Sequence, residues 1–145
     1  MVKQVLSVVA LVSFLVALAV AGSQSSSGSF RVEIPFDSIA GETKLKAGSY
    51  TVDSSMVRDV PLIRSADYRT NVFVLTFGGN TSGNPSRAKL VFRRYGDKYF
   101  LTQIWNEGST VAMELPESRA ERELKRELKY LARAVQAEIV TVPAS

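Results

Sequence analysis

The side chains of this chain that could do chemistry are aspartates in its turns and arginines beside aromatic residues. Paired carboxylates serve as general acid and base in hydrolases, and closely spaced carboxylates bind calcium. Asp53, Asp59, Asp67 and Asp97 show neither spacing, and turn capping explains each of them more simply. We expect no catalytic residue among them and keep a carboxylate-based hydrolase as the enzymatic alternative.

Histidine and cysteine are absent from the sequence. Imidazole is the commonest general base and metal ligand at neutral pH, and thiolates supply many nucleophiles and zinc ligands. We therefore predict a protein that is not an enzyme and that holds no cofactor and no metal. Without disulfides, the stability of the fold must come from packing and hydrogen bonding.

Basic and aromatic residues alternate along Lys89–Trp105, which is the clearest local signal. Gly96-Asp97 suits a two-residue type II′ turn, because that turn needs glycine at its first central position. The predicted hairpin pairs Tyr95 with Lys98, Arg94 with Tyr99, Arg93 with Phe100, Phe92 with Leu101, and Leu90 with Gln103. Its expected core face consists of Leu90, Phe92, Leu101 and Trp105.

The opposite face of the hairpin is typical neither of solvent nor of core, because Lys89, Arg93 and Lys98 alternate there with Val91, Tyr95, Phe100 and Ile104. Arginines beside aromatic rings can bind an acidic polymer, and Arg31 and Arg64 could add to such a surface. Ordinary cross-strand pairing explains the same pattern. The predicted binding surface consists of Arg93, Arg94, Tyr95, Lys98, Tyr99 and Phe100.

The formal net charge is +4 at pH 7, and no run exceeds two consecutive basic residues. Nucleic-acid-binding proteins carry a basic stripe or patch, so the charge pattern argues against a nucleic-acid partner. An apolar fraction of 46% is typical of an ordinary globular protein, and we expect a single domain.

Short runs rich in Val, Ile, Phe, Tyr and Thr, separated by turn residues, predict a mostly antiparallel sheet. The expected strands are Phe30–Phe36, Thr43–Leu45, Gly48–Ser54, Pro61–Ser65, Asn71–Phe77, Ala88–Tyr95, Lys98–Asn106 and Thr110–Leu115. Gly78–Ser86 consists of turn formers, and we expect a mobile loop there. The expected fold is mainly β, a small antiparallel β-sandwich or partly open barrel.

A C-terminal amphipathic α-helix is predicted at about residues 118–138, and Ile139–Val142 favours a short strand. Ser118 is the expected N-cap, and Glu121 could reach back to it in a capping box or pair with Lys125. The apolar stripe of the helix either covers the sheet or mediates self-association. Its residues are Leu124, Leu128, Leu131 and Val135.

The N-terminal segment 1–21 is typical of a signal peptide, with Lys3, an uncharged apolar run and Ala19-Val20-Ala21 before the cleavage site. The alternative is a retained membrane anchor. Residues 22–29 are rich in serine and glycine and predict a flexible tether to a single domain over residues 30–142. We expect an exported protein in the periplasm, at the cell surface or outside the cell, which meets the membrane only through its signal segment.

Five sequence blocks, Phe30–Asp37, Leu45–Val52, Leu62–Asp67, Lys89–Asp97 and Glu114–Leu124, resemble an uncharacterised family of small exported proteins with signal peptides, found mainly in acidobacterial-type soil bacteria. The resemblance covers most of residues 30–126 and implies export and a shared β-rich fold. The chain departs from the family pattern at Ser38, where an aromatic residue is usual, at Lys46, where proline is usual, and at Arg93, where histidine is common. A guanidinium stays protonated, so Arg93 could not act as a base.

These observations favour a non-enzymatic binding or structural module that engages a protein, an envelope polymer or a small ligand. The first alternative is a self-assembling subunit, a homo-oligomer that joins its copies through sheet edges and the C-terminal helix. The second is the hydrolase.

Overall fold

The computed structural model describes residues 28–131 and 136–145. The predicted signal segment 1–21, tether residues 22–27 and Val135 lie outside these ranges. The last two tether residues belong to the folded domain, because Ser54 N–H donates to Gly28 O (2.6 Å) and Ser29 begins the first strand. Within the described ranges, no helix has the length and apolar character needed to cross a membrane.

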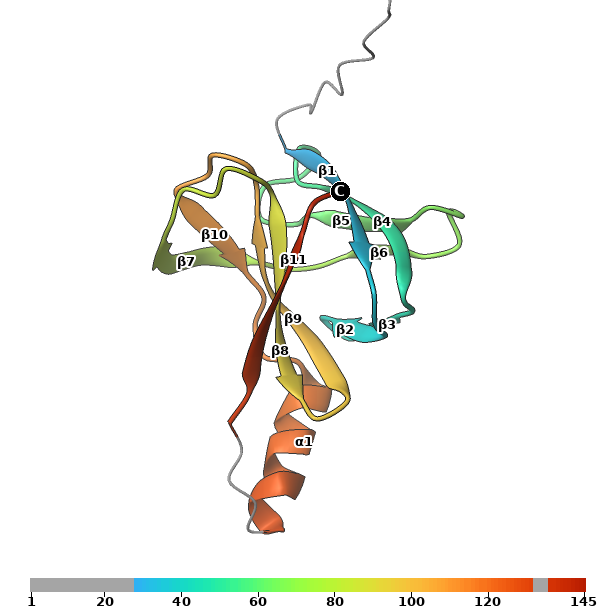
Figure 1. The fold of residues 1–145 in the computed structure, drawn as a ribbon, viewed down its shortest axis with the longest axis vertical. Coiled ribbons are helices and arrows are strands. Elements are labelled where there is room, and N and C mark those ends of the chain that lie inside the picture. The colour runs from blue at the N-terminus through green and yellow to red at the C-terminus, as the bar shows by residue number, and fades with distance from the viewer. Residues whose placement is uncertain (1–27, 132–135) are drawn as a thin grey trace, which may run out of the picture.

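The described residues form two β-sheets and a helix (Figure 1). The elements are β1 (Ser29–Ile34), β2 (Ser38–Ala40), β3 (Thr43–Leu45), β4 (Gly48–Asp53), β5 (Leu62–Ser65), β6 (Asn71–Phe73), β7 (Phe77–Ser82), β8 (Lys89–Tyr95), β9 (Lys98–Trp105), β10 (Val111–Glu114), α1 (Arg119–Tyr130) and β11 (Glu138–Pro143). The first sheet has the order β1-β4-β5-β6, and the second has the order β11-β8-β9-β10-β7. The predicted mainly β, sandwich-like fold is confirmed.

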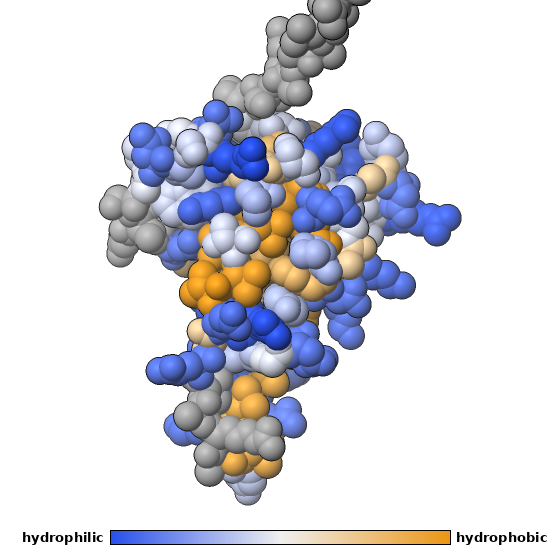
Figure 2. Space-filling model, in the orientation of Figure 1, coloured by the Kyte–Doolittle hydropathy of each residue, from blue (hydrophilic) through white to orange (hydrophobic). Residues whose placement is uncertain are grey.

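The hydrophobic core lies between the inner faces of the two sheets. Successive residues of a strand point to opposite faces, so Val32 and Ile34 of β1 are buried while Arg31 and Glu33 are exposed. The main cluster of buried side chains draws on both sheets and includes Val52, Ile63, Leu90, Phe92, Leu101 and Ile104. Polar side chains cover most of the face in Figure 2, with apolar ones gathered at its middle.

The C-terminal strand connects the two sheets on one side of the domain. β11 pairs with β8, and just beyond it Ala144 forms a bridge with Val32 of β1, while Ser145 N–H donates to Arg31 O (2.9 Å). The strand predicted at Ile139–Val142 is confirmed. The other ends of the two sheets are the edge strands β6 and β7, which follow one another in the chain.

The β8–β9 hairpin has the predicted turn and, near the turn, the predicted register. Gly96 has a φ of +62°, which suits glycine, and Phe92 lies opposite Leu101 as expected. A bulge further along places Leu90 opposite Ile104, so the predicted pairing of Leu90 with Gln103 is wrong. An extra residue in one strand reverses which side chains face the core beyond it.

The bulge moves two side chains to the opposite faces from those predicted. Ile104 joins the main core cluster, and Trp105 packs instead with Val91 and Ala112 in a small cluster of its own. Leu90, Phe92 and Leu101 lie in the core as predicted, whereas Trp105 does not lie with them.

The expected loop at Gly78–Ser86 is partly a strand. β7 runs through Ser82 and pairs with β10, with Phe77 opposite Glu114. Glycines make close packing possible here: a Cβ at Gly79 would lie 2.3 Å from Oε1 of Glu114, and one at Gly83 would lie 2.8 Å from the Trp105 ring. The turn-forming residues therefore fit an edge strand that packs closely on large neighbours.

Helix α1 begins as predicted, with Ser118 as its N-cap, and it ends at Tyr130, earlier than the predicted end near residue 138. Glu138 already belongs to β11. Within α1 the buried residue is Glu121, and Leu124 and Leu128 are half-buried. The helix meets the β8–β9 end of the second sheet near its first turn and extends beyond it (Figure 1).

The bulge generates a stability prediction. Because Ile104 lies in the core, Ile104→Ala should lower the free energy of unfolding by about 2–5 kcal/mol. The matched control, Ile139→Ala, removes a side chain that is 62% exposed and should change it by less than about 0.5 kcal/mol. Urea denaturation measures both values, and equal losses would contradict the observed register.

Candidate functional site

A buried carboxylate joins the helix to the second sheet. The Glu121 side chain is only 2% exposed. Arg93 Nε and Nη2 donate to its two oxygens at 2.6 and 3.0 Å, and Tyr95 Oη donates to Oε1 at 2.8 Å. The backbone N–H of Glu121 donates to Oγ of the N-cap residue Ser118 (3.1 Å). Glu121 therefore takes part in the helix cap through its backbone and binds the sheet through its side chain.

The charge states in this cluster are those of a structural ion pair. The hydrogen bond to Glu121 raises the pKa of Arg93 above its ordinary value. Burial, and then the hydrogen bond to Glu121, raise the pKa of Tyr95 to about 12. Arg93 therefore stays charged and Tyr95 stays protonated at neutral pH, and both serve to hold the carboxylate.

The cluster corrects two expectations for the helix. The Glu121 carboxylate binds the sheet rather than completing a capping box, because Arg93 offers it a two-pronged ion pair. Lys125 Nζ lies 2.8 Å from Glu117 Oε2, so its partner is Glu117 rather than Glu121. The sequence pattern predicted that Arg93 and Tyr95 belong to a ligand-binding surface, and it did not indicate their contact with Glu121.

The six residues of the predicted binding surface are divided between two faces. Arg93, Tyr95 and Phe100 lie on the face that the helix meets; Tyr95 and Phe100 are buried there, and Lys98 is exposed beside Tyr95 at the turn. Arg94 and Tyr99 lie on the opposite face.

The second of these two faces is also partly covered. The Tyr99 ring stacks on Phe36 with 3.7 Å between ring centres, and the Arg94 guanidinium lies 5.5 Å from the Tyr99 ring. The structure therefore does not bring the six residues together, because alternation along a strand separates neighbouring side chains.

A different set of residues shares one exposed surface, the outer face of the first sheet. The register places Arg31 opposite Thr51, Thr51 opposite Arg64, and Arg64 opposite Asn71, in one row across four strands. Acidic residues occupy the neighbouring rows, Glu33 opposite Ser49 and Asp53 opposite Leu62. We define the outer face by Arg31, Glu33, Ser49, Thr51, Asp53, Arg64, Asn71 and Phe73.

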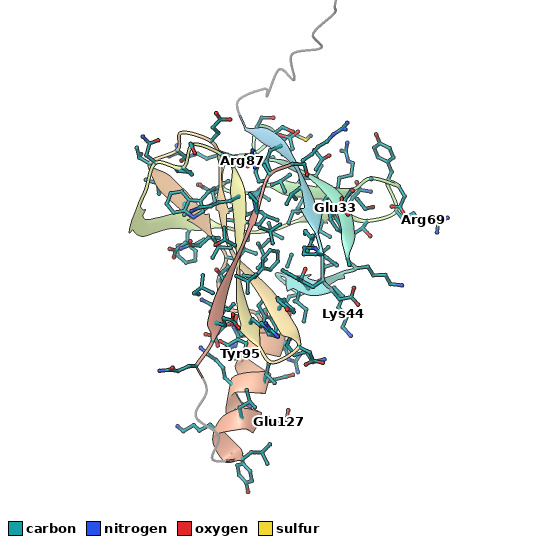
Figure 3. The ribbon with its side chains drawn as sticks, viewed as in Figure 1. Glu33, Lys44, Arg69, Arg87, Tyr95 and Glu127 are labelled. Carbon is teal, nitrogen blue, oxygen red and sulfur yellow. The ribbon has the colours of Figure 1, made fainter. Side chains whose placement is uncertain are left out.

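An exposed aromatic ring stands at the end of this face, in the turn between β5 and β6. Tyr68 is 71% exposed and has a φ of +60°, a left-handed conformation that is unusual for a bulky residue. The Arg64 guanidinium lies 5.8 Å from its ring. Figure 3 shows the same turn reaching away from the domain at Arg69, with Glu33 on the face itself.

Hydrogen bonds hold the turn that presents Tyr68. Asp67 Oδ1 accepts from Ser65 Oγ (2.6 Å) and from Arg69 N–H (3.0 Å), and the Ser65 hydroxyl lowers the pKa of Asp67. Asn71 Nδ2 donates to Tyr68 O (3.1 Å). A strained residue persists when its surroundings determine its conformation, and these bonds hold the backbone of the turn that carries the ring.

The polar groups of the outer face are organised around Arg64. Arg64 Nε donates to Asn71 Oδ1 (3.1 Å). The Ser55 hydroxyl and amide lower the pKa of Asp53, and the charge of Arg64 adds to the effect. The face thus carries a guanidinium, an amide and a carboxylate beside a ring. Sequence reasoning named Arg31 and Arg64 but missed Tyr68, whose backbone conformation gives no sequence signal.

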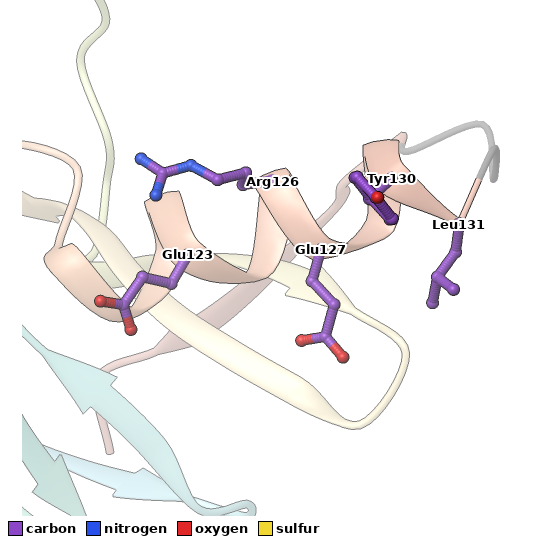
Figure 4. A pocket seen from close by; sticks show the side chains of 5 residues that line it. All are labelled: Glu123, Arg126, Glu127, Tyr130 and Leu131. Carbon is purple, nitrogen blue, oxygen red and sulfur yellow. The ribbon is translucent and has the colours of Figure 1, made fainter.

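The predicted self-association stripe is only partly exposed. Leu124 and Leu128 are half-buried, Leu131 is 58% exposed, and Val135 lies outside the described residues. A hollow of about 330 Å³ lies along the helix (Figure 4). Among the described residues, its lining consists of Glu123, Arg126, Glu127, Tyr130 and Leu131.

Comparison with known proteins does not assign a family: no protein-family model, curated protein or solved structure matches this chain. In the described part of the chain, acidic side chains do not gather in threes as a metal site would need.

The buried ion pair predicts an unequal effect of two similar substitutions. Glu121→Gln keeps the shape of the side chain but leaves Arg93 without its counter-charge, which should cost about 1–3 kcal/mol of unfolding free energy. The control, Glu123→Gln, breaks an exposed pair with Arg119 and should cost at most about 1 kcal/mol. Urea denaturation at neutral pH tests this difference.

The raised pKa of Tyr95 predicts alkaline destabilisation. The folded state keeps the phenol proton up to about pH 12, whereas an unfolded tyrosine releases it near its ordinary pKa of 10. The contribution of Tyr95 to stability is thus complete below pH 10 and is lost as pH rises toward 12. Unfolding measured across this range should depend less on pH in Tyr95→Phe than in the unaltered protein. Tyr130→Phe, on a ring that is 92% exposed, should leave the dependence unchanged.

Proposed function

We propose that this protein is an exported, non-enzymatic binding module that holds a neutral, polyhydroxylated polymer of the cell envelope on the outer face of its first sheet. The observation that carries the proposal is Tyr68, an exposed ring held in a strained backbone conformation at the end of that face. Strain of this kind persists where the structure determines it and often accompanies function. The apolar N-terminal run supports export.

The chemistry of the face suits a hydroxylated ligand. Arg64 and Asn71 offer planar donors and Asp53 offers acceptor oxygens, so neighbouring hydroxyl groups of a sugar could both donate and accept here. The Tyr68 ring supplies a flat apolar surface with a polar tip, against which the C–H groups of a sugar ring can pack.

The charge pattern favours a neutral polymer over an acidic one. The basic row of Arg31 and Arg64 lies between rows that carry Glu33 and Asp53. A polyanion would meet repulsion from these carboxylates, whereas hydroxyl groups can bind both signs of charge. An open, exposed sheet face also fits an extended chain that contacts several rows at once.

Affinity electrophoresis through gels that contain a soluble neutral glucan or an acidic uronic-acid polymer tests the proposal. We expect retardation by the neutral polymer that persists in high salt, because little of the binding is ionic. Tyr68→Ala should weaken binding about fivefold to tenfold, as expected for loss of one ring contact, and Tyr68→Phe should retain most of it.

One control variant and three refuting outcomes complete the test. Tyr130→Ala removes an exposed ring on the helix and should leave retardation unchanged. Migration unaffected by either polymer, or equal binding by the Tyr68→Ala variant, would refute a polymer site on the outer face. Retardation by the acidic polymer alone would refute the neutral ligand.

A further inference from the structure

Three large apolar side chains stand exposed in a row where the chain passes from the first sheet to the second. Phe73, Leu75 and Phe77 are 57%, 69% and 49% exposed, whereas Val74 and Thr76 between them are 2% and 5% exposed. Val74 N–H donates to Pro61 O (3.1 Å) and Thr76 N–H to Asp59 O (2.8 Å), so the segment is held extended. Alternation then directs the three exposed side chains to one side. We name Phe73, Leu75 and Phe77 the apolar strip.

The apolar strip is a contiguous exposed surface and not a set of single apolar residues scattered over the domain. Exposed aromatic side chains beside sheet edges promote association, and soluble proteins usually cover them. Glycan binding on the outer face does not require Leu75 or Phe77, so the strip needs its own explanation.

The order of residues in the strip reads the same in both directions. Phe73 and Phe77 lie at equal spacing on either side of Leu75, so antiparallel packing of two strips about Leu75 would set Phe73 of one copy against Phe77 of the other. The geometry points to a second copy of this chain as the occupant, with two strips packed face to face in antiparallel orientation about Leu75. A two-fold dimer requires one self-complementary patch, and this pattern supplies it.

The charges at the two ends of the strip are complementary in this arrangement. At one end Arg64 binds Asn71, and at the other end the Glu114 carboxylate lies against Gly79. Arg64 pairs with Asn71, which is two residues before Phe73, so Arg64 and Phe73 face the same side of the sheet. At the other end, Glu114 pairs with Phe77. Antiparallel packing therefore places the basic end of one copy near the acidic end of the other, which favours this orientation over the parallel one.

The size of the strip determines how strong the dimer is. Each large side chain, roughly half exposed, offers on the order of 100 Å² for burial. Two strips then bury roughly 600 Å² from these side chains, below the ~1,200 Å² of a standard stable interface. The dimer is therefore weak and reversible, and it forms as protein concentration rises.

Sedimentation velocity from low micromolar to near-millimolar protein tests the proposal. We expect a monomer at the low end and a dimer at the high end. Leu75→Asp places two carboxylates together at the two-fold axis and should leave a monomer throughout. Leu75 is exposed, so the variant should unfold in urea as the unaltered protein does.

Matched controls separate this interface from the other exposed apolar residues. Ile139→Asp on β11 and Leu131→Asp after the helix alter residues that are 62% and 58% exposed, and both variants should still dimerise. Dimerisation lost in either of them but kept in Leu75→Asp would overturn the proposal, as would an unaltered protein that stays monomeric throughout.

A cross-link gives a second, independent readout. The chain contains no cysteine, so Leu75→Cys introduces a single thiol at the two-fold axis. Mild oxidation should convert it to a disulfide-linked dimer faster than Met56→Cys, a control at a residue that is 62% exposed away from the strip. Equal rates for the two variants would contradict the proposed axis. Tyr68→Ala should not change dimerisation, so the two proposals fail independently.

Discussion

The buried carboxylate of Glu121 constrains how the helix and the second sheet are joined. An ionised group that is 2% exposed must be paired and hydrogen-bonded, and Arg93 and Tyr95 meet this requirement from a single strand. Removing one partner would leave the other charge poorly solvated, which is far more costly than losing an exposed pair. The first turn of α1 is therefore joined to the second sheet by a buried ion pair.

This anchor changes the meaning of the most conspicuous sequence pattern. Arginine alternating with aromatic residues along the β8–β9 hairpin looks like a ligand surface, but the structure distributes these side chains between two faces. Arg93 and Tyr95 bind Glu121, and Tyr99 stacks on Phe36. The surfaces that we propose for partners lie elsewhere, on the outer face of the first sheet and on the apolar strip between β6 and β7.

Both surfaces follow from the way the domain is closed. The C-terminal residues bridge β11 to β1 on one side, and the sheets end at β6 and β7 on the other. The turn before β6 carries Tyr68, and the segment after it carries Leu75. We thus propose ligand binding and self-association for neighbouring parts of one chain segment. Tyr68 is central to ligand binding, and Leu75 is central to self-association.

The sequence by itself determined the elements that depend on local pattern. Alternation predicts most strands, glycine at position 96 predicts the hairpin turn, and Ser118 predicts the start of the helix. Tertiary structure alone decided the rest. The bulge that exchanges Ile104 and Trp105 depends on how two strands fit over a core, and β7 depends on pairing with β10. The partners of Glu121 and the ring of Tyr68 were equally hidden, because contacts across more than 20 residues and a left-handed backbone leave no periodic trace in the sequence.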